Sequence, residues 1–361
     1  MALTGKQRLN AVLHGQPSNR LAWTTLVDRA TLDIMPPELS GNSGLDLYRH
    51  LGCDILLLDS WGLPVGFRSP QLVWGLQVTV RSETQGEYTS TEWDTPHGSL
   101  SATWRRNHPS KYPVTTLAEV LLYREMWESA HYVPHDDSQA LQQMEALLGD
   151  DGILTRFWGP STIPHLLETA MGTEAFYYLL NDYPAEMEGL IAAIHTCELE
   201  AFQALAAGPV EVAILCENTS TYYIGPEIYR RYNRPHVTDF CRIIRAAGKV
   251  ALVHMCGHIR NLLPQLASTG LQGVHGLTPP PVGDTPYELY LDAIGEDQVI
   301  LGVLEPTVFN TGNVEDIWRT LDALYTARLR RSRFVLWAAA DGLPVPLWRF
   351  EAVRDWMARN G

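Results

Sequence analysis

The sequence predicts an α/β fold, a (β/α)8 TIM barrel with a β-hairpin and helical insertion after the second strand. Eight short apolar runs recur along the chain, and segments with helical periodicity separate them. Residues 72–106 interrupt this rhythm once with period-two alternation and turn residues, which indicates an antiparallel insertion. A doubly wound sheet is the alternative, and it is disfavoured because no glycine-rich phosphate turn follows the first run.

The apolar runs are mostly continuous rather than alternating, which is typical of parallel strands covered on both faces. The predicted strands are Leu21–Val27, Asp54–Asp59, Ile153–Trp158, Glu211–Cys216, Lys249–His254, Leu271–His275, Val299–Val303 and Arg333–Ala339. The predicted helices are Ala185–Ala207, Pro226–Ala247, Asn261–Ser268, Pro286–Ile294, Val314–Leu329 and Pro346–Asn360. No repeat or low-complexity linker divides the chain, so we expect one domain over residues 1–361, with the insertion at about 68–150.

Composition and charge exclude several classes of protein. The chain carries 27 Lys and Arg against 41 Asp and Glu, a net charge of −14, which argues against binding to nucleic acid or anionic membranes. Its longest apolar runs fall far short of the ~18 residues that a membrane-spanning helix needs. Five cysteines in a long chain, together with an N-terminus that lacks an apolar signal region, indicate a cytoplasmic protein with reduced thiols.

Reactive side chains gather where the predicted strands end, which is where TIM barrels place their chemistry. We expect a catalytic role in proton transfer for one or more of Glu217, His275 and Asp59. Four aromatic residues at or just after strand ends are candidates for binding a flat substrate: Trp61, Trp158, Tyr222 and Tyr223.

The segment Val253–Gly257 contains a histidine and a cysteine two positions apart at a strand end. Side chains two residues apart in a strand share a face, so His254 and Cys256 can turn toward one point. Imidazole nitrogen and thiolate sulfur are preferred zinc ligands. Two ligands do not hold a zinc ion, and the carboxylates of Glu217 and Asp341 are the further donors available at neighbouring strand ends.

Each candidate also has a structural alternative. His254 and Cys256 can be a buried histidine and an inert thiol, and Glu217 can cap a helix or form an ion pair. His275 can hydrogen-bond the backbone of the proline-rich loop that follows it. Asp341 precedes a glycine and so fits a turn, and the aromatic residues can serve packing alone.

Several blocks of the chain resemble the uroporphyrinogen decarboxylase superfamily. They are Cys216–Thr219 with Gly225–Tyr232, His254–Gly257, Leu277–Asp284, Leu301–Pro306, Asn19–Arg20 and Phe157–Thr162. The resemblance covers essentially the whole chain and implies a TIM barrel. One branch of that superfamily decarboxylates a tetrapyrrole with an arginine-rich N-terminal motif, whereas the first strand here leads into Val27–Ala30 with a single arginine.

The resemblance therefore favours the second branch, the cobalamin-dependent methyltransferases. In these proteins zinc is held by an H-x-C pair, matched here by His254 and Cys256, and by a cysteine after the last strand. This chain has Asp341 at that last position, so either Asp341 or Glu217 is expected to complete the site. An oxygen-richer site is a harder Lewis acid and implies a substrate other than a thiol.

The resemblance implies transfer of a methyl group between a small methylated substrate and cobalamin on a partner corrinoid protein. A methyl group on oxygen or nitrogen has a basic leaving group, so zinc or a nearby acid must stabilise that group as it departs. We expect O-demethylation of a methoxylated aromatic compound by a cytoplasmic protein that is a candidate homodimer. The alternatives are a tetrapyrrole decarboxylase and a non-catalytic module that binds a corrinoid protein.

Overall fold

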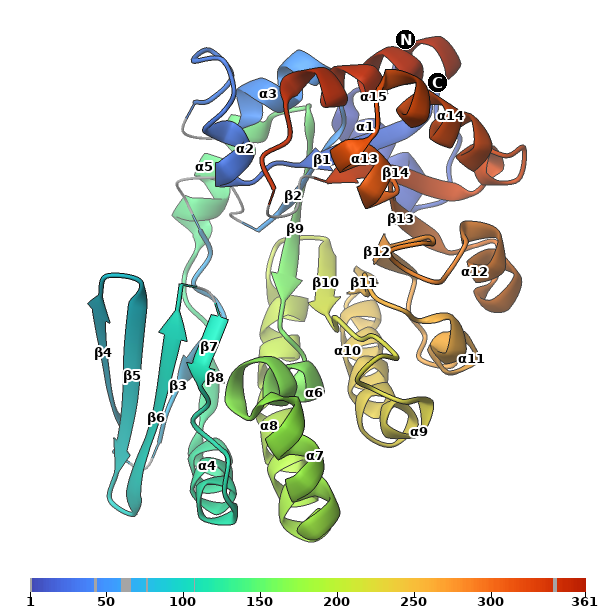
Figure 1. The fold of residues 1–361 in the computed structure, drawn as a ribbon. Helices are drawn as coiled ribbons and strands as arrows, with labels where there is room; N and C mark the ends of the chain where they lie inside the picture. Colours follow the sequence, from blue (N-terminus) through green and yellow to red (C-terminus); the bar gives the residue numbers. More distant parts are fainter. Residues whose placement is uncertain (1, 42–43, 60–65, 76, 107, 340–342) are drawn as a thin grey trace.

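The computed structural model describes residues 2–41, 44–59, 66–75, 77–106, 108–339 and 343–361. Eight parallel strands form one sheet in the order β1-β14-β13-β12-β11-β10-β9-β2, which curls into a nearly closed barrel (Figure 1). The strands are β1 (Ala22–Leu26), β2 (Ile55–Leu58), β9 (Gly152–Trp158), β10 (Val212–Cys216), β11 (Val250–His254), β12 (Gly273–Leu277), β13 (Val299–Val303) and β14 (Arg333–Ala339). The predicted TIM barrel is confirmed, and each predicted strand coincides with an observed one to within a few residues.

Helices alternate with the barrel strands and cover the barrel (Figure 1). The longer ones are α1 (Gly5–Leu13), α3 (Leu45–Leu51), α7 (Gly172–Asp182), α8 (Pro184–Ala207), α10 (Arg234–Ala246), α12 (Tyr287–Ile294), α14 (Val314–Leu324) and α15 (Leu347–Asn360). Short helices are α2 (Arg29–Leu32), α6 (Thr162–His165), α9 (Pro226–Ile228), α11 (Leu263–Leu266) and α13 (Pro306–Thr311). Two π-helical turns, η1 (Leu166–Ala170) and η2 (Tyr229–Asn233), and two 3-10 turns, η3 (Arg260–Leu262) and η4 (Leu329–Arg331), also belong to the barrel part of the chain.

The insertion lies between β2 and β9. Its antiparallel sheet has the order β4-β5-β6-β7, formed by Thr79–Gln85, Tyr88–Thr95, Gly98–Arg105 and His108–Lys111. A two-stranded ladder of β3 (Gln71–Val73) and β8 (His131–Val133) and two helices, α4 (Leu117–Ser129) and α5 (Ser138–Leu148), join that sheet to the barrel. Period-two alternation therefore predicted this sheet correctly.

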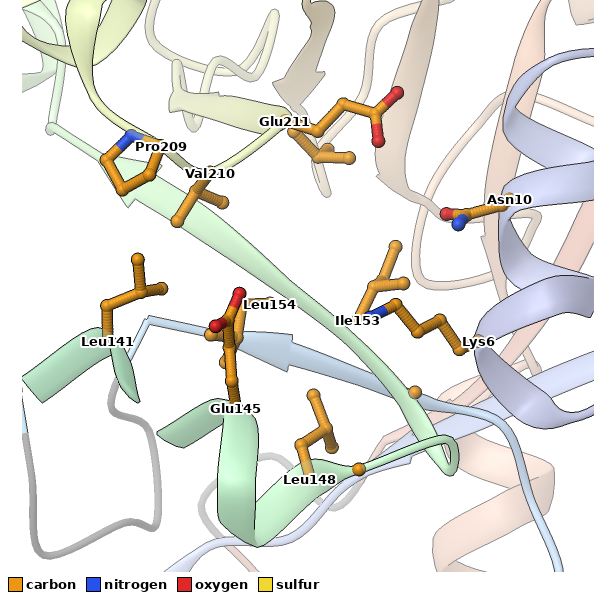
Figure 2. A pocket seen from close by; sticks show the side chains of 13 residues that line it. Lys6, Asn10, Leu141, Glu145, Leu148, Ile153, Leu154, Pro209, Val210 and Glu211 are labelled. Atoms are coloured by element: carbon orange, nitrogen blue, oxygen red, sulfur yellow. The ribbon is translucent and has the colours of Figure 1, made fainter. Parts of the chain in front are cut away.

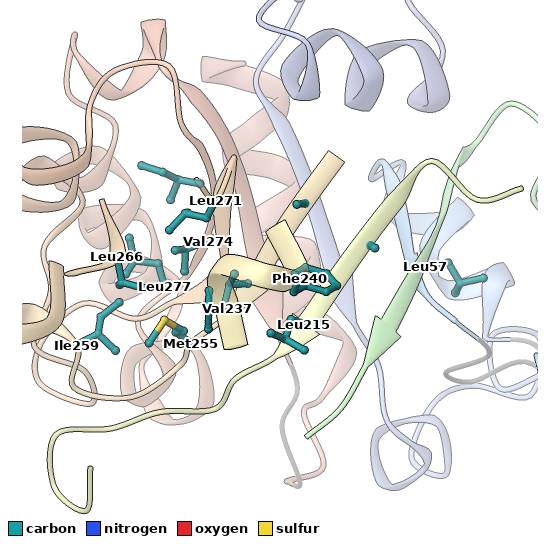
Figure 3. Close-up of a cluster of buried hydrophobic side chains, with 14 of the residues drawn as sticks. Leu57, Leu215, Val237, Phe240, Met255, Ile259, Leu266, Leu271, Val274 and Leu277 are labelled. Atoms are coloured by element: carbon teal, nitrogen blue, oxygen red, sulfur yellow. The ribbon is translucent and has the colours of Figure 1, made fainter. Parts of the chain in front are cut away.

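Apolar side chains form two separate clusters. The larger fills the space between strands and helices, where Leu215, Phe240 and Met255 are fully buried (Figure 3). The smaller fills the barrel interior with side chains such as Ile214 and Leu252. Because strand side chains alternate, the series that contains Leu252 continues to His254, which therefore points toward the barrel axis.

Helix α8 is long and apolar enough to cross a membrane, and it is alone in this among the helices of the described ranges. Its side chains Leu190, Ile194 and Phe202 are buried in the larger apolar cluster. That packing is typical of the core helix of a barrel.

Candidate functional site

The carboxyl ends of β10, β11 and β12 bring three reactive side chains into one row. In the parallel ladders Cys216 lies opposite His254, and His254 lies opposite His275. The Nδ1 atoms of the two imidazoles are 2.8 Å apart, within hydrogen-bond distance. The two histidines that the sequence analysis selected therefore contact each other directly at the barrel mouth.

This imidazole pair is enclosed by aromatic rings. The Phe157 ring lies edge-on to both imidazoles, with centroid distances of 5.5 Å to His254 and 6.0 Å to His275. The Trp337 ring lies 4.4 Å from the His275 ring. Burial lowers the pKa of His254 to about 4, and burial together with the neighbouring His254 lowers the pKa of His275 well below its ordinary value. Both rings are therefore neutral near pH 7, so one donates its Nδ1 proton and the other accepts it.

Gly276 makes the close approach of the two rings possible. Its φ is +77°, and a Cβ at this position would lie 2.7 Å from Cε1 of His254. The ladder between β12 and β13 shifts register at the same point, between His275 and Leu277. A side chain at position 276 would be strained and would displace the His254 ring.

Cys256 lies two residues beyond His254 and is exposed at the mouth. Its Sγ lies 3.2 Å from Oδ1 of Asn218. The Asn218 Nδ2 in turn donates to Oε1 of Glu168 at 2.7 Å, and the Asn218 backbone N–H donates to the carbonyl of His254 at 2.9 Å. Asn218 thus links the β10 loop to both candidate metal ligands, with a φ of +46° that asparagine tolerates better than most residues.

The carboxylate of Glu217 is hydrogen-bonded to groups other than His254 and Cys256. Its carboxylate is fully buried and accepts hydrogen bonds from the Ser161 hydroxyl, from Thr219 Oγ1 at 2.9 Å and from Asn233 Nδ2 at 2.7 Å. Burial raises its pKa, and the three donors oppose that rise. The carboxylate therefore ties the β10 loop to α6 and η2, an arrangement that favours a structural role over metal binding.

A second buried carboxylate, Glu198 on α8, accepts a hydrogen bond from Thr162 Oγ1 at 2.6 Å. Burial raises its pKa to about 8, so the folded chain holds a proton that the unfolded chain releases above its ordinary pKa of 4.5.

The free energy of unfolding therefore falls as pH rises between these values, by ~1.4 kcal/mol per pH unit at most. We expect Glu198→Gln to flatten this dependence, measured by urea unfolding at pH 5.5 and 7.5. Equal slopes in both proteins would contradict the assignment.

Asp59, the third candidate catalytic residue, is held by an ion pair. Nε of Arg156 donates to its Oδ1 at 2.7 Å, and the same guanidinium lies 4.4 Å from the centre of the Phe67 ring. Burial raises the pKa of the Asp59 carboxyl, and Arg156 opposes that rise. Since Arg156 also donates to the carbonyl of Ser69, the pair connects the barrel wall to the insertion.

The aromatic candidates occupy different environments. Trp158 packs edge-on against Tyr132 of the insertion, with the ring centroids 5.3 Å apart. Tyr222 is 80% exposed beside the ring of His258, whereas the Tyr223 hydroxyl donates to the carbonyl of Asn218 at 2.5 Å. Tyr222 is thus the freest of the three to contact a ligand.

Trp61 and Asp341 lie outside the described residues, so their predicted substrate-binding and metal-binding roles stay predictions. The sequence analysis also missed Asn218, Glu168 and the two flanking rings, Phe157 and Trp337. Phe157 and Trp337 were visible as inward positions of their strands by period-two counting. Glu168 was not visible, because only the fold brings its helix to Asn218.

A zinc site needs three or four donor atoms arranged around one point. Within the described ranges no group of three or more His, Cys, Asp or Glu side chains is arranged to hold a metal ion. The pair of His254 and Cys256 would supply one nitrogen and one sulfur, and the Nδ1 contact with His275 leaves only Nε2 of His254 open to a metal. His254 and Cys256 alone offer two donors, fewer than the three or four protein ligands that hold zinc in proteins.

A cavity of about 180 Å³ lies at the opposite end of the barrel (Figure 2). It is lined by Lys6, Glu145, Glu211 and the first residues of β9 and β10. Since strands begin there and TIM barrels place their chemistry where strands end, this cavity is not the candidate site.

Comparison with known proteins gives two findings. The model of the family described as "Uroporphyrinogen decarboxylase (URO-D)" matches residues 153–345, more than half of the chain. A solved structure described as a methyltransferase from Methanosarcina mazei is similar with a TM-score of 0.60 over 99% of each chain, at 14% sequence identity, which shows the same fold. A search of curated proteins finds no match.

Proposed function

Since the chain belongs to the uroporphyrinogen decarboxylase family, we propose that it is a zinc-dependent methyltransferase. It moves a methyl group between a small methylated substrate and cobalamin carried by a corrinoid protein. The observation that carries this proposal is the imidazole and thiol placed two residues apart at the end of β11, with His254 held by His275. The similarity of the fold to a methyltransferase structure supports it.

His254 and Cys256 would hold the zinc ion together with Asp341. When bound, zinc would stabilise the oxygen or nitrogen that leaves the methyl group. The low pKa of His254 leaves its imidazole neutral, so metal binding requires no loss of a proton from that ring. His275 fixes the orientation of the His254 ring through the Nδ1 contact.

The other residues of the mouth position the thiol and exclude water. Asn218 accepts from Cys256 and is itself fixed by Glu168 and by the Tyr223 hydroxyl. Phe157 shields the imidazole pair from solvent on one side. For the substrate we propose a methoxylated aromatic compound, whose ring would contact the exposed Tyr222 beside the mouth.

The test is an absorbance assay that follows conversion of cob(I)alamin to methylcobalamin, with a panel of methoxylated aromatic compounds as methyl donors. The proposal expects methyl transfer that depends on the protein and on one class of donor. Uroporphyrinogen is assayed in parallel. Decarboxylation of the tetrapyrrole, or binding of corrinoid without turnover of any donor, would overturn the proposal.

A further inference from the structure

The antiparallel sheet of the insertion ends in an open edge. Strand β4 pairs only with β5, and it lies at the outside of the molecule (Figure 1). All seven of its residues are exposed, including Val80 at 46%. Its other edge therefore presents backbone N–H and C=O groups that have no strand partner within the described ranges.

Proteins usually protect such edges with proline, a bulge, charged side chains or a covering helix or loop. Strand β4, with the sequence TVRSETQ, contains neither proline nor lysine, and its seven pairs with β5 run without a register shift. Its only charged side chains are Arg81 and Glu83, on one face and two residues apart. An edge this regular is suited to pairing with another strand.

Strand β4 is complementary to itself. In an antiparallel pair of two β4 strands centred on Ser82, Arg81 of each copy lies opposite Glu83 of the other. The same register places Val80 opposite Thr84 and Ser82 opposite Ser82. Directly opposed side chains on one face of a sheet interact most strongly. One ion pair between Arg81 and Glu83 therefore lies on each side of the central Ser82 pair.

We propose that β4 is a homodimerisation edge, which pairs with β4 of a second copy about a two-fold axis at Ser82. The two four-stranded sheets then join into one eight-stranded antiparallel sheet. Arg81 also contacts Asp94 and Glu92 within its own sheet, and its guanidinium has donors left for Glu83 of the second copy. The charges favour a second copy of this chain as the occupant, because two identical β4 strands centred on Ser82 form both ion pairs at once. A register shifted by two residues would instead oppose like charges.

Cysteine cross-linking tests the register. Across the proposed axis two Ser82 Cα atoms lie ~5 Å apart, within the range that a disulfide bridges. Ser82→Cys is therefore expected to give a covalent dimer under mild oxidation. Thr84→Cys is the matched control, since two Thr84 positions lie ~13 Å apart in this register and are not expected to cross-link. Equal cross-linking of both variants and wild type would overturn the proposal.

Charge reversal tests the pairing without covalent trapping. Arg81→Glu and Glu83→Arg each place like charges opposite each other, so each variant alone is expected to be monomeric by light scattering. An equimolar mixture of the two is expected to dimerise, because the ion pairs then form between the two different chains. A wild type that is monomeric up to ~100 μM, well above the affinity of typical specific complexes, or single variants that dimerise as wild type does, would contradict the proposed edge.

Discussion

His254→Ala is expected to lower the rate of methyl transfer by ~100-fold or more. The substitution removes the imidazole that faces the barrel axis and leaves the buried His275 without its Nδ1 partner. If His254 holds the proposed zinc ion, its loss would remove the group that stabilises the leaving atom, and a 100-fold loss corresponds to ~2.7 kcal/mol of transition-state stabilisation. The measurement is the cob(I)alamin methylation rate at a saturating donor concentration.

His108→Ala is the matched control, since it removes an exposed histidine from β7 of the insertion. This variant is expected to retain the wild-type rate. The rate of methyl transfer is expected to fall as far in Cys256→Ala as in His254→Ala. A variant at position 254 that keeps its full rate while remaining folded would exclude His254 from the reaction.

Glu217→Ala is expected to lower the free energy of unfolding by ~1–3 kcal/mol, the cost typical of leaving buried hydrogen-bonding groups without a partner. The substitution leaves the buried side chains of Ser161, Thr219 and Asn233 without their common acceptor and opens a cavity behind β10. Denaturant unfolding at fixed pH measures the effect.

Glu217→Gln and Glu227→Ala serve as controls for this prediction. The amide of Gln keeps one acceptor oxygen, so its effect is expected to be smaller than that of Ala. Glu227 is exposed on α9, and Glu227→Ala is expected to leave the unfolding midpoint unchanged. If Glu217→Ala is instead as stable as wild type but loses bound zinc, Glu217 is a metal ligand and its structural role is wrong.

The barrel was predictable from sequence because each strand is a short apolar run that can be recognised without knowing which strands it pairs with. The same local periodicity placed His254 on the inner face. The surroundings of the carboxylates were not predictable, because they depend on contacts distant in sequence. Ser161 donates to Glu217 from another strand-to-helix loop, and Arg156 contacts Asp59 from the neighbouring strand β9. The sequence analysis could identify these acidic residues but not the groups that donate hydrogen bonds to them.

The zinc content of the purified chain is the most direct test of the central claim, that His254 and Cys256 hold a metal ion at the barrel mouth. Elemental analysis is expected to find about one zinc per chain in wild type, as in single-ion zinc sites. Zinc is expected to be lost from His254→Ala and from Cys256→Ala, and retained in the control Cys241→Ala, which removes a buried thiol of α10. A folded wild type without zinc after growth with the metal, or zinc content that none of these substitutions changes, would contradict the account.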